Sequence, residues 1–170
     1  QEWATFYRFD DAGRIIVQAS PSAVSGYDDE CADLLCWEED EFVYLRDDQG
    51  LITEYAYYPE TNPEYGWAAG QLEQVAVHEG ETGTWIVQSR MTYTGRTVDG
   101  AEIFLLASRT DYANENTTGG VTTNYAYQFY EDTFNVYQKT ITDPAGNTTD
   151  LVYDVYGRVI WKRDSAGFLT

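Results

Sequence analysis

The chain has 170 residues, of which 29 are acidic and 10 are basic, and its net charge at pH 7 is −19. This charge argues against a nucleic-acid backbone or an anionic membrane surface as a partner, and no run of about 20 apolar residues marks a membrane-spanning segment. The length suits one ordinary domain, and the 15 tyrosines favour strands over helices.

A period of two in the apolar residues predicts a series of short strands along the chain. Because tight turns separate them, neighbouring strands should pair antiparallel. Three connections interrupt the series: an acidic stretch at 28–41 compatible with a helical turn, a stretch with two prolines at 59–70, and a polar loop at 113–120. The sequence therefore predicts an all-β fold with little helix, a twisted antiparallel sheet or a β-spiral. The predicted strands are 14–18, 51–58, 72–78, 84–94, 101–109, 122–130, 134–142, 149–153 and 159–163.

Five turns share the pattern Asp-x-x-Gly, where random order would give about one copy. The Asp side chain can accept a hydrogen bond from the backbone two residues further on, and Gly tolerates the left-handed conformation that leads into the next strand. The pattern therefore predicts tight hairpin turns. The copies run from Asp10 to Gly13, Asp47 to Gly50, Asp143 to Gly146, Asp154 to Gly157 and Asp164 to Gly167.

Two of these turns follow an aromatic residue and precede an arginine: Phe9-Asp10-x-x-Gly13-Arg14 and Tyr153-Asp154-x-x-Gly157-Arg158. The turn at 47–50 is followed by Thr53 and Tyr57, at the spacing of Thr149 and Tyr153, but no Gly-Arg comes next. This pattern resembles the YD repeat of the RHS (rearrangement hot spot) family. The resemblance is strongest over 140–170 and weakest over 60–118.

The resemblance implies a spiralling β-sheet, which in bacterial toxins encloses a cargo and in animal teneurins forms part of an adhesion ectodomain. The autoproteolytic aspartate of the toxin shells is not carried over, because Asn147 follows the Asp143 turn where the shells have leucine. The resemblance supports a structural repeat unit, with a fragment of a toxin-encapsulating shell as the alternative.

The repeat that begins with the Asp164 turn lacks the Tyr-Asp-x-x-Gly-Arg segment that should follow it. If Thr170 is joined to Gln1, the similar segment from Phe9 to Arg14 completes the repeat. We therefore expect residues 1–170 to be one YD-repeat-like β unit of a longer tandem chain, or a unit that joins copies of itself head to tail into a filament, stalk or shell. Such an assembly is expected outside the cell or on its surface.

Cysteine and asparagine residues suggest covalent features of a secreted protein. Cys31 and Cys36 are expected to form a local disulfide, with two buried free thiols as the alternative. Asn116 and Asn147 each begin an Asn-x-Thr glycosylation sequon.

No residue pattern indicates catalysis or a resident cofactor, so we expect that the protein is not an enzyme. His78 has no partner at a suitable spacing and is expected on the surface. The acidic clusters at 28–30 and 38–41 leave calcium binding open, although neither has the spacing of a known calcium loop. Five tryptophans and 15 tyrosines either pack the faces of the sheet or offer a stacking platform for glycans, which would make the chain a carbohydrate-binding or adhesion module.

Overall fold

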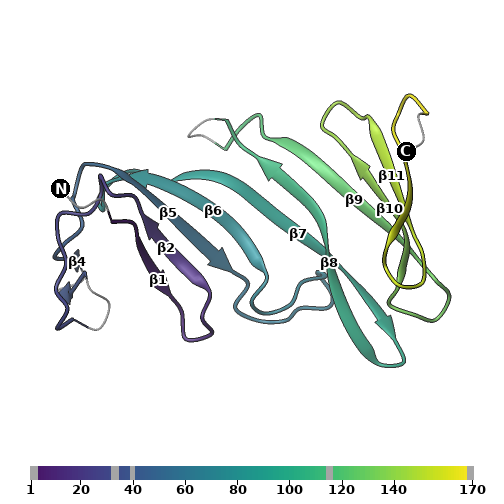
Figure 1. Cartoon of the computed structure of the whole chain (residues 1–170), viewed down its shortest axis with the longest axis horizontal. Coiled ribbons are helices and arrows are strands. Elements are labelled where there is room, and N and C mark those ends of the chain that lie inside the picture. Colours follow the sequence, from purple (N-terminus) through teal and green to yellow (C-terminus); the bar gives the residue numbers. More distant parts are fainter. Residues whose placement is uncertain (1–3, 32–34, 39–40, 114–116, 168–170) are drawn as a thin grey trace. The chain divides into compact units, whose positions relative to one another are not determined.

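The computed structural model describes residues 4–31, 35–38, 41–113 and 117–167. Ten strands form one open antiparallel sheet in which sheet order follows chain order, and a separate two-stranded hairpin leaves the sheet between its second and third strands (Figure 1). The sheet contains β1 (Phe6–Phe9), β2 (Ile15–Ala19), β5 (Leu51–Tyr57), β6 (Leu72–Glu79), β7 (Ile86–Val98), β8 (Ala101–Asp111), β9 (Val121–Phe129), β10 (Val136–Thr142), β11 (Thr148–Tyr153) and β12 (Val159–Arg163). The hairpin pairs β3 (Trp37–Glu38) with β4 (Glu41–Phe42).

The predicted all-β class is confirmed, and each predicted strand corresponds to an observed one. The helical turn that was compatible with 28–41 is not found in the described residues of that stretch, where β3 and β4 lie instead. Strand β1 was not predicted, because four residues ending at a turn give too short an alternation to recognise.

Residue contacts divide the chain into two compact units. The first unit comprises residues 1–56, 72–89 and 112–118, and the second comprises 57–71, 90–111 and 119–170. The first unit contains a hydrophobic core, because the excursion between β2 and β5 folds over the strands it connects. The core residues are Ala19, Ala23, Leu35, Phe42, Leu45 and Ile52.

The excursion from Ser20 to Gly50 leaves and rejoins the sheet at one narrow neck. The Ser20 amide donates to the carbonyl of Leu51 at 2.9 Å, and the Leu51 amide donates to Ser20 Oγ at 3.0 Å. Beyond this neck β2 and β5 pair directly, with Ala19 opposite Ile52 and Val17 opposite Glu54. The excursion therefore does not interrupt the pairing of the strands on either side of it.

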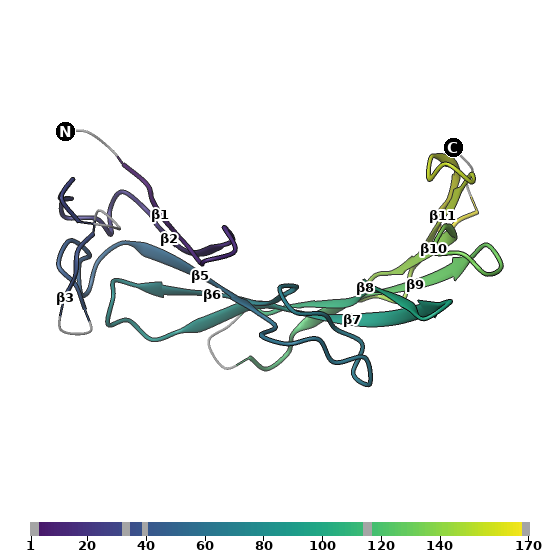
Figure 2. The same ribbon diagram turned by 90° about the horizontal axis from the view of Figure 1, so that it is seen from below.

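The second unit has almost no apolar core. Among its described residues, one hydrophobic side chain, that of Met91, and one charged side chain, that of Asp150, are buried. Strands β9, β10 and β11 lie side by side, as their pairing requires (Figure 2). Its strands are therefore held mainly by hydrogen bonds and contacts between neighbouring strands rather than by packing against a second layer.

Gly50 and Gly157 allow a matched test of backbone strain and close packing. Both have a positive φ, +81° and +77°, but a Cβ at Gly50 would lie 2.1 Å from the backbone nitrogen of Ala23, whereas nothing lies within 4 Å of a Cβ at Gly157. We expect Gly157→Ala to lower the free energy of unfolding by about 1–2 kcal/mol, from strain alone. Gly50→Ala should cost about 3 kcal/mol or more, because overpacking adds to the same strain. Urea unfolding followed by circular dichroism measures both, and equal losses would contradict the packing argument.

Candidate functional site

The predicted turn chemistry is present at Asp10. Its Oδ1 accepts hydrogen bonds from the amides of Ala12 and Arg14, at 3.0 and 2.9 Å, and its Oδ2 accepts from Arg14 Nε at 2.6 Å. The amide of Gly13 donates to the Asp10 carbonyl, and the amide of Asp10 donates to the Arg14 carbonyl. With Gly13 at φ +77°, this is a three-residue hairpin loop in which glycine adopts the left-handed conformation.

The same hydrogen-bonding pattern of the turn aspartate recurs at Asp154 and, with one change, at Asp143. Asp154 Oδ1 accepts from the amides of Tyr156 and Arg158, and its Oδ2 accepts from Arg158 Nε at 2.7 Å. At the Asp143 turn the side-chain amide of Asn147 takes the place of the guanidinium and donates to Asp143 Oδ2 at 2.9 Å. The Asp164 turn has the corresponding bonds from Ala166 and Gly167 to Asp164.

The two aromatic-Asp-x-x-Gly-Arg copies also share the same strand register. Phe9 lies opposite Ile15 and Tyr153 lies opposite Val159, and in each case the register shifts at that aromatic residue. An extra residue on the second strand of each hairpin produces this bulge. The two copies are therefore structurally equivalent over the turn and the first strand pairs.

Hydrogen bonding to the ionised aspartates lowers their pKa values. The pKa of Asp154 lies below its usual value because the side chain and then the backbone amide of Arg158 bond to the carboxylate. The backbone and side chain of Arg14 lower the pKa of Asp10 in the same way, and the side chain of Asn147 lowers that of Asp143. The ionised carboxylate is thus the form that closes each turn.

The turn from Asp47 to Gly50 is not a copy of this hairpin, and the prediction for it was wrong. The carbonyl of Asp47 accepts from the amide and the hydroxyl of Thr82, at 3.0 and 2.8 Å, and the carbonyl of Gly50 accepts from the Gly80 amide. The segment therefore lies against the loop that follows β6 rather than joining two paired strands. A contact over more than 30 residues of chain was not visible in the local pattern.

A hairpin turn that was not predicted from the sequence lies at Asp99-Gly100. Both residues have a positive φ, +50° and +81°, and they join β7 to β8. Two such residues in succession form the tight turn whose twist suits a hairpin, and Asp-Gly is among its commonest sequences.

His78 is buried, which contradicts its expected place on the surface. Its Nδ1 lies 2.6 Å from the carbonyl oxygen of Gly80, its Nε2 lies 3.1 Å from Glu54 Oε1, and its ring stacks on Trp85 at 5.0 Å between centroids. Because a carbonyl only accepts, Nδ1 carries a proton, and Nε2 either donates to a carboxylate or accepts from a carboxylic acid. Burial raises the pKa of Glu54, and the adjacent His78 partly opposes that shift.

A cavity of about 420 Å³ in the first unit opens beside this pair. Its apolar wall includes Ile16, Val17 and Ile52, and its polar groups include Arg8 and Glu81. Glu54 and His78 are hydrogen-bonded to each other there, and the described lining also includes Tyr55 and Glu81.

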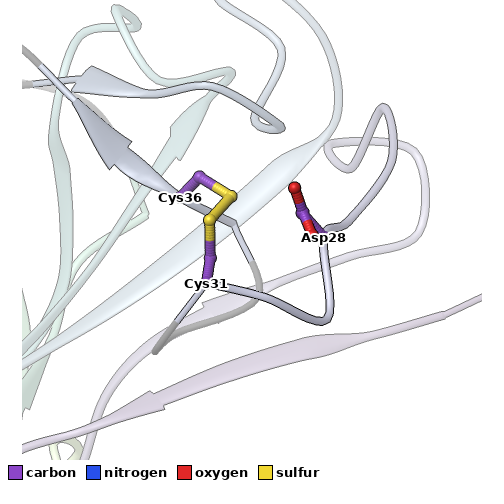
Figure 3. Close-up of side chains that lie close together, drawn as sticks. All are labelled: Asp28, Cys31 and Cys36. Carbon is purple, nitrogen blue, oxygen red and sulfur yellow. A yellow bond between two sulfur atoms is a disulfide. The ribbon is translucent and has the colours of Figure 1, made fainter.

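Cys31 and Cys36 form a disulfide in the loop before β3, and the alternative of two free thiols is not what the structure has (Figure 3). Asp28 lies close to these two cysteines. Within the described part of the chain, these three residues form one cluster of side chains of the types that bind metals, and their potential ligand atoms lie within 4.8 Å of one another. Disulfide sulfurs are not thiolates, so this trio lacks the anionic sulfur ligands that zinc requires. Of the acidic clusters considered for calcium, residues 39–40 lie outside the described residues.

Of the two glycosylation sequons, the one at Asn147 begins within the described residues. Asn116 lies outside the described residues, and Asn147 is exposed but its side-chain nitrogen donates to Asp143. That nitrogen is the atom to which a glycan would be attached. Glycosylation at Asn147 stays a prediction.

Exposed apolar side chains gather at the two edges of the sheet. Edge strand β1 carries Tyr7 and Phe9, and the hairpin of β11 with edge strand β12 carries Val155, Tyr156, Val159 and Ile160; together these are six of the 12 large exposed hydrophobic residues in the described chain. Each edge strand pairs with one neighbour in the sheet order. Within the described residues, both edges therefore combine a strand that has one partner with exposed apolar side chains, and such an edge can pair with a strand of another chain.

Edge strand β12 is tied to the sheet by an ion pair between a buried aspartate and an arginine whose side chain is 52% exposed. Asp150 on β11 is 8% exposed, and its Oδ2 accepts from Arg163 on β12 at 2.7 Å. Its Oδ1 accepts from the Thr140 hydroxyl on β10 at 2.7 Å. One carboxylate thus fixes three successive strands, and the Arg163 side chain lowers its pKa.

In the part of the chain that the structure describes, no helix is long and apolar enough to cross a membrane. No model of a protein family matches the chain, and no curated protein shows significant similarity to it. The resemblance to YD repeats accordingly stays a prediction from the residues.

The lowered aspartate pKa values predict that the hairpins lose stability in acid. Because the folded pKa values of Asp143 and Asp154 lie below the ordinary 3.8, these groups stabilise the fold above that pH, and the contribution is lost as pH falls through the folded values. The double variant Asp143→Asn, Asp154→Asn should show a shallower loss of unfolding free energy between about pH 5 and about pH 2. Denaturant unfolding at several pH values measures the slopes, and parallel curves for the two proteins would contradict the assignment.

Proposed function

We propose that the chain is a structural β unit that extends its sheet by pairing β12 of one copy with β1 of the next. The observation that carries the proposal is that four exposed apolar residues lie on the two edge strands and two more lie on the turn before β12. Pairing there would satisfy the outer backbone groups of both strands and cover these side chains.

Strand direction is compatible with this head-to-tail continuation. Neighbouring strands in the sheet alternate in direction, so β12, the tenth strand, runs opposite to β1, the first. When β12 of one copy lies beside β1 of another, the antiparallel order therefore continues without a break. A contact between two different surfaces does not close on itself in a pair, so it can propagate into a longer assembly.

The sparse core of the second unit also supports an assembled state. A single layer of strands exposes both faces, and small sheets need another layer or further strands to be stable. Additional copies would supply strands at the β12 edge, next to the ion pair of Asp150 with Arg163 that already orders this edge.

The equivalent turns at Asp10 and Asp154 support the view that the chain is a repeat unit of YD type, as the sequence resemblance suggests. The disulfide between Cys31 and Cys36 favours an oxidising location outside the cell or at its surface. A structural role in an extracellular filament, stalk or shell accounts for both features without any catalytic chemistry.

Charged substitutions at the edges should prevent assembly. We expect the wild-type chain to exceed its monomer mass of 19.3 kDa increasingly as concentration rises from about 1 µM to about 1 mM. Ile160→Lys on β12 and Tyr7→Lys on β1 should each remain monomeric, because a charge then replaces an apolar side chain that the proposed contact would cover. Val121→Lys is the matched control, since Val121 is 53% exposed and Ile160 58%, but β9 lies between two partners in the sheet.

A mixture of the two edge variants distinguishes head-to-tail pairing from other modes. Each variant keeps one intact edge, so an equimolar mixture should form dimers and nothing larger. Sedimentation velocity would resolve these species. Dimers in either variant alone would indicate pairing between identical edges, and a wild-type chain that is monomeric throughout the concentration range would refute the proposal.

A further inference from the structure

The second unit contains a column of three stacked aromatic rings at the loop between β5 and β6. Trp67 stacks on Tyr58 with 4.6 Å between ring centroids and an interplanar angle of 11°, and Tyr65 stacks on Trp67 at 5.2 Å and 14°. Tyr65 is nevertheless 63% exposed. A large flat ring is thus held at the surface with much of its area in solvent.

The column is fixed by hydrogen bonds at its base and along the loop. The Tyr58 hydroxyl donates to the carbonyl of Met91 on β7 at 3.1 Å, and Tyr58 meets Tyr93 edge to face. Asn62 pairs through its backbone with Trp67, and its side-chain oxygen accepts from the Tyr65 amide at 3.3 Å. The orientation of the exposed ring is therefore set before any ligand arrives, which reduces the entropy cost of binding.

Gly66 brings this loop close to β7. It has φ +84°, and a Cβ there would lie 2.9 Å from the carbonyl oxygen of Tyr93. This close approach places Tyr65 at the border of a cavity of about 290 Å³ formed with β7 and β8. The volume is near the lower end of the range for ligand pockets, which suits a ligand of one or two rings.

The other walls of this cavity carry hydrogen-bonding groups. Glu64 and Glu102 contribute carboxylates, and Thr94 and Thr97 contribute hydroxyls, with the Thr97 hydroxyl 3.3 Å from Glu102 Oε1. No lysine or arginine is among the described lining residues. Carboxylates accept from hydroxyl groups, whereas their charge and the net charge of −19 repel phosphate, sulfate and carboxylate groups.

From these features we infer that the Tyr65 cavity binds a neutral glycan, with one pyranose ring stacked on Tyr65. The apolar face of the sugar would cover the exposed side of the aromatic ring, and its hydroxyls would donate to Glu64 and Glu102 and exchange hydrogen bonds with Thr94 and Thr97. The site lies wholly within the second unit and does not depend on pairing at the sheet edges.

Titration with neutral oligosaccharides tests the site. The probes are β-1,4-linked oligomers of glucose, xylose, mannose and N-acetylglucosamine, followed by calorimetry and by tryptophan fluorescence, because Trp67 lies under Tyr65. We expect at least one series to bind with a dissociation constant below about 10 mM. Tyr65→Ala should weaken that binding about tenfold or more, whereas Tyr65→Phe, which keeps the flat ring, should change it by less than about threefold.

Tyr27→Ala is the matched control, since Tyr27 is 59% exposed and belongs to the first unit. It should leave glycan binding unchanged, and circular dichroism verifies that each variant is folded. Absence of binding across the four series, or equal binding by wild type and Tyr65→Ala, would overturn the inference. Tight binding of choline in place of the sugars would also overturn it, because the rings and carboxylates would then form a site for a cation.

Discussion

The hydrogen bond from an aspartate carboxylate to the backbone of its own turn is the local constraint that closes three hairpins of this sheet. At Asp10, Asp143 and Asp154 it satisfies two amides that the hairpin leaves without a strand partner. Each hairpin is thereby closed by residues within five positions of one another. A sheet built from such hairpins can hold its strands in register even where little apolar surface is buried, as in the second unit.

This local closure has a cost at the ends of the sheet. Hairpins satisfy the strands between them, but among the described strands β1 and β12 each have only one neighbour in the sheet. Proteins usually protect such edges with charges, prolines or a covering element. Here β12 carries the exposed Lys162 and Arg163, but Tyr7 and Ile160 are also exposed on the two edge strands. The proposed pairing between copies gives these two apolar residues a physical role.

Much of the fold could be predicted from the sequence because its determinants are local. Alternation located the strands, and Asp with Gly at the fourth position located the hairpins at Asp10, Asp143 and Asp154. Features set by distant residues could not be found in this way. The burial of His78 depends on Glu54 and Trp85, and the different role of Gly50 depends on its contact with Ala23. The Tyr65 column likewise requires a loop to lie on β7, which no pattern along the chain encodes.

The excursion between β2 and β5 suggests how this kind of sheet can diversify. It leaves at Ser20 and returns at Leu51 through a neck closed by two hydrogen bonds, and its disulfide lies within it. Because the flanking strands pair below the neck, the inserted segment can change in length or sequence with little effect on the register of the strands that carry it. In the proposed assembly, one copy could therefore acquire a longer inserted segment at this position while the paired strands of the other copies stay the same.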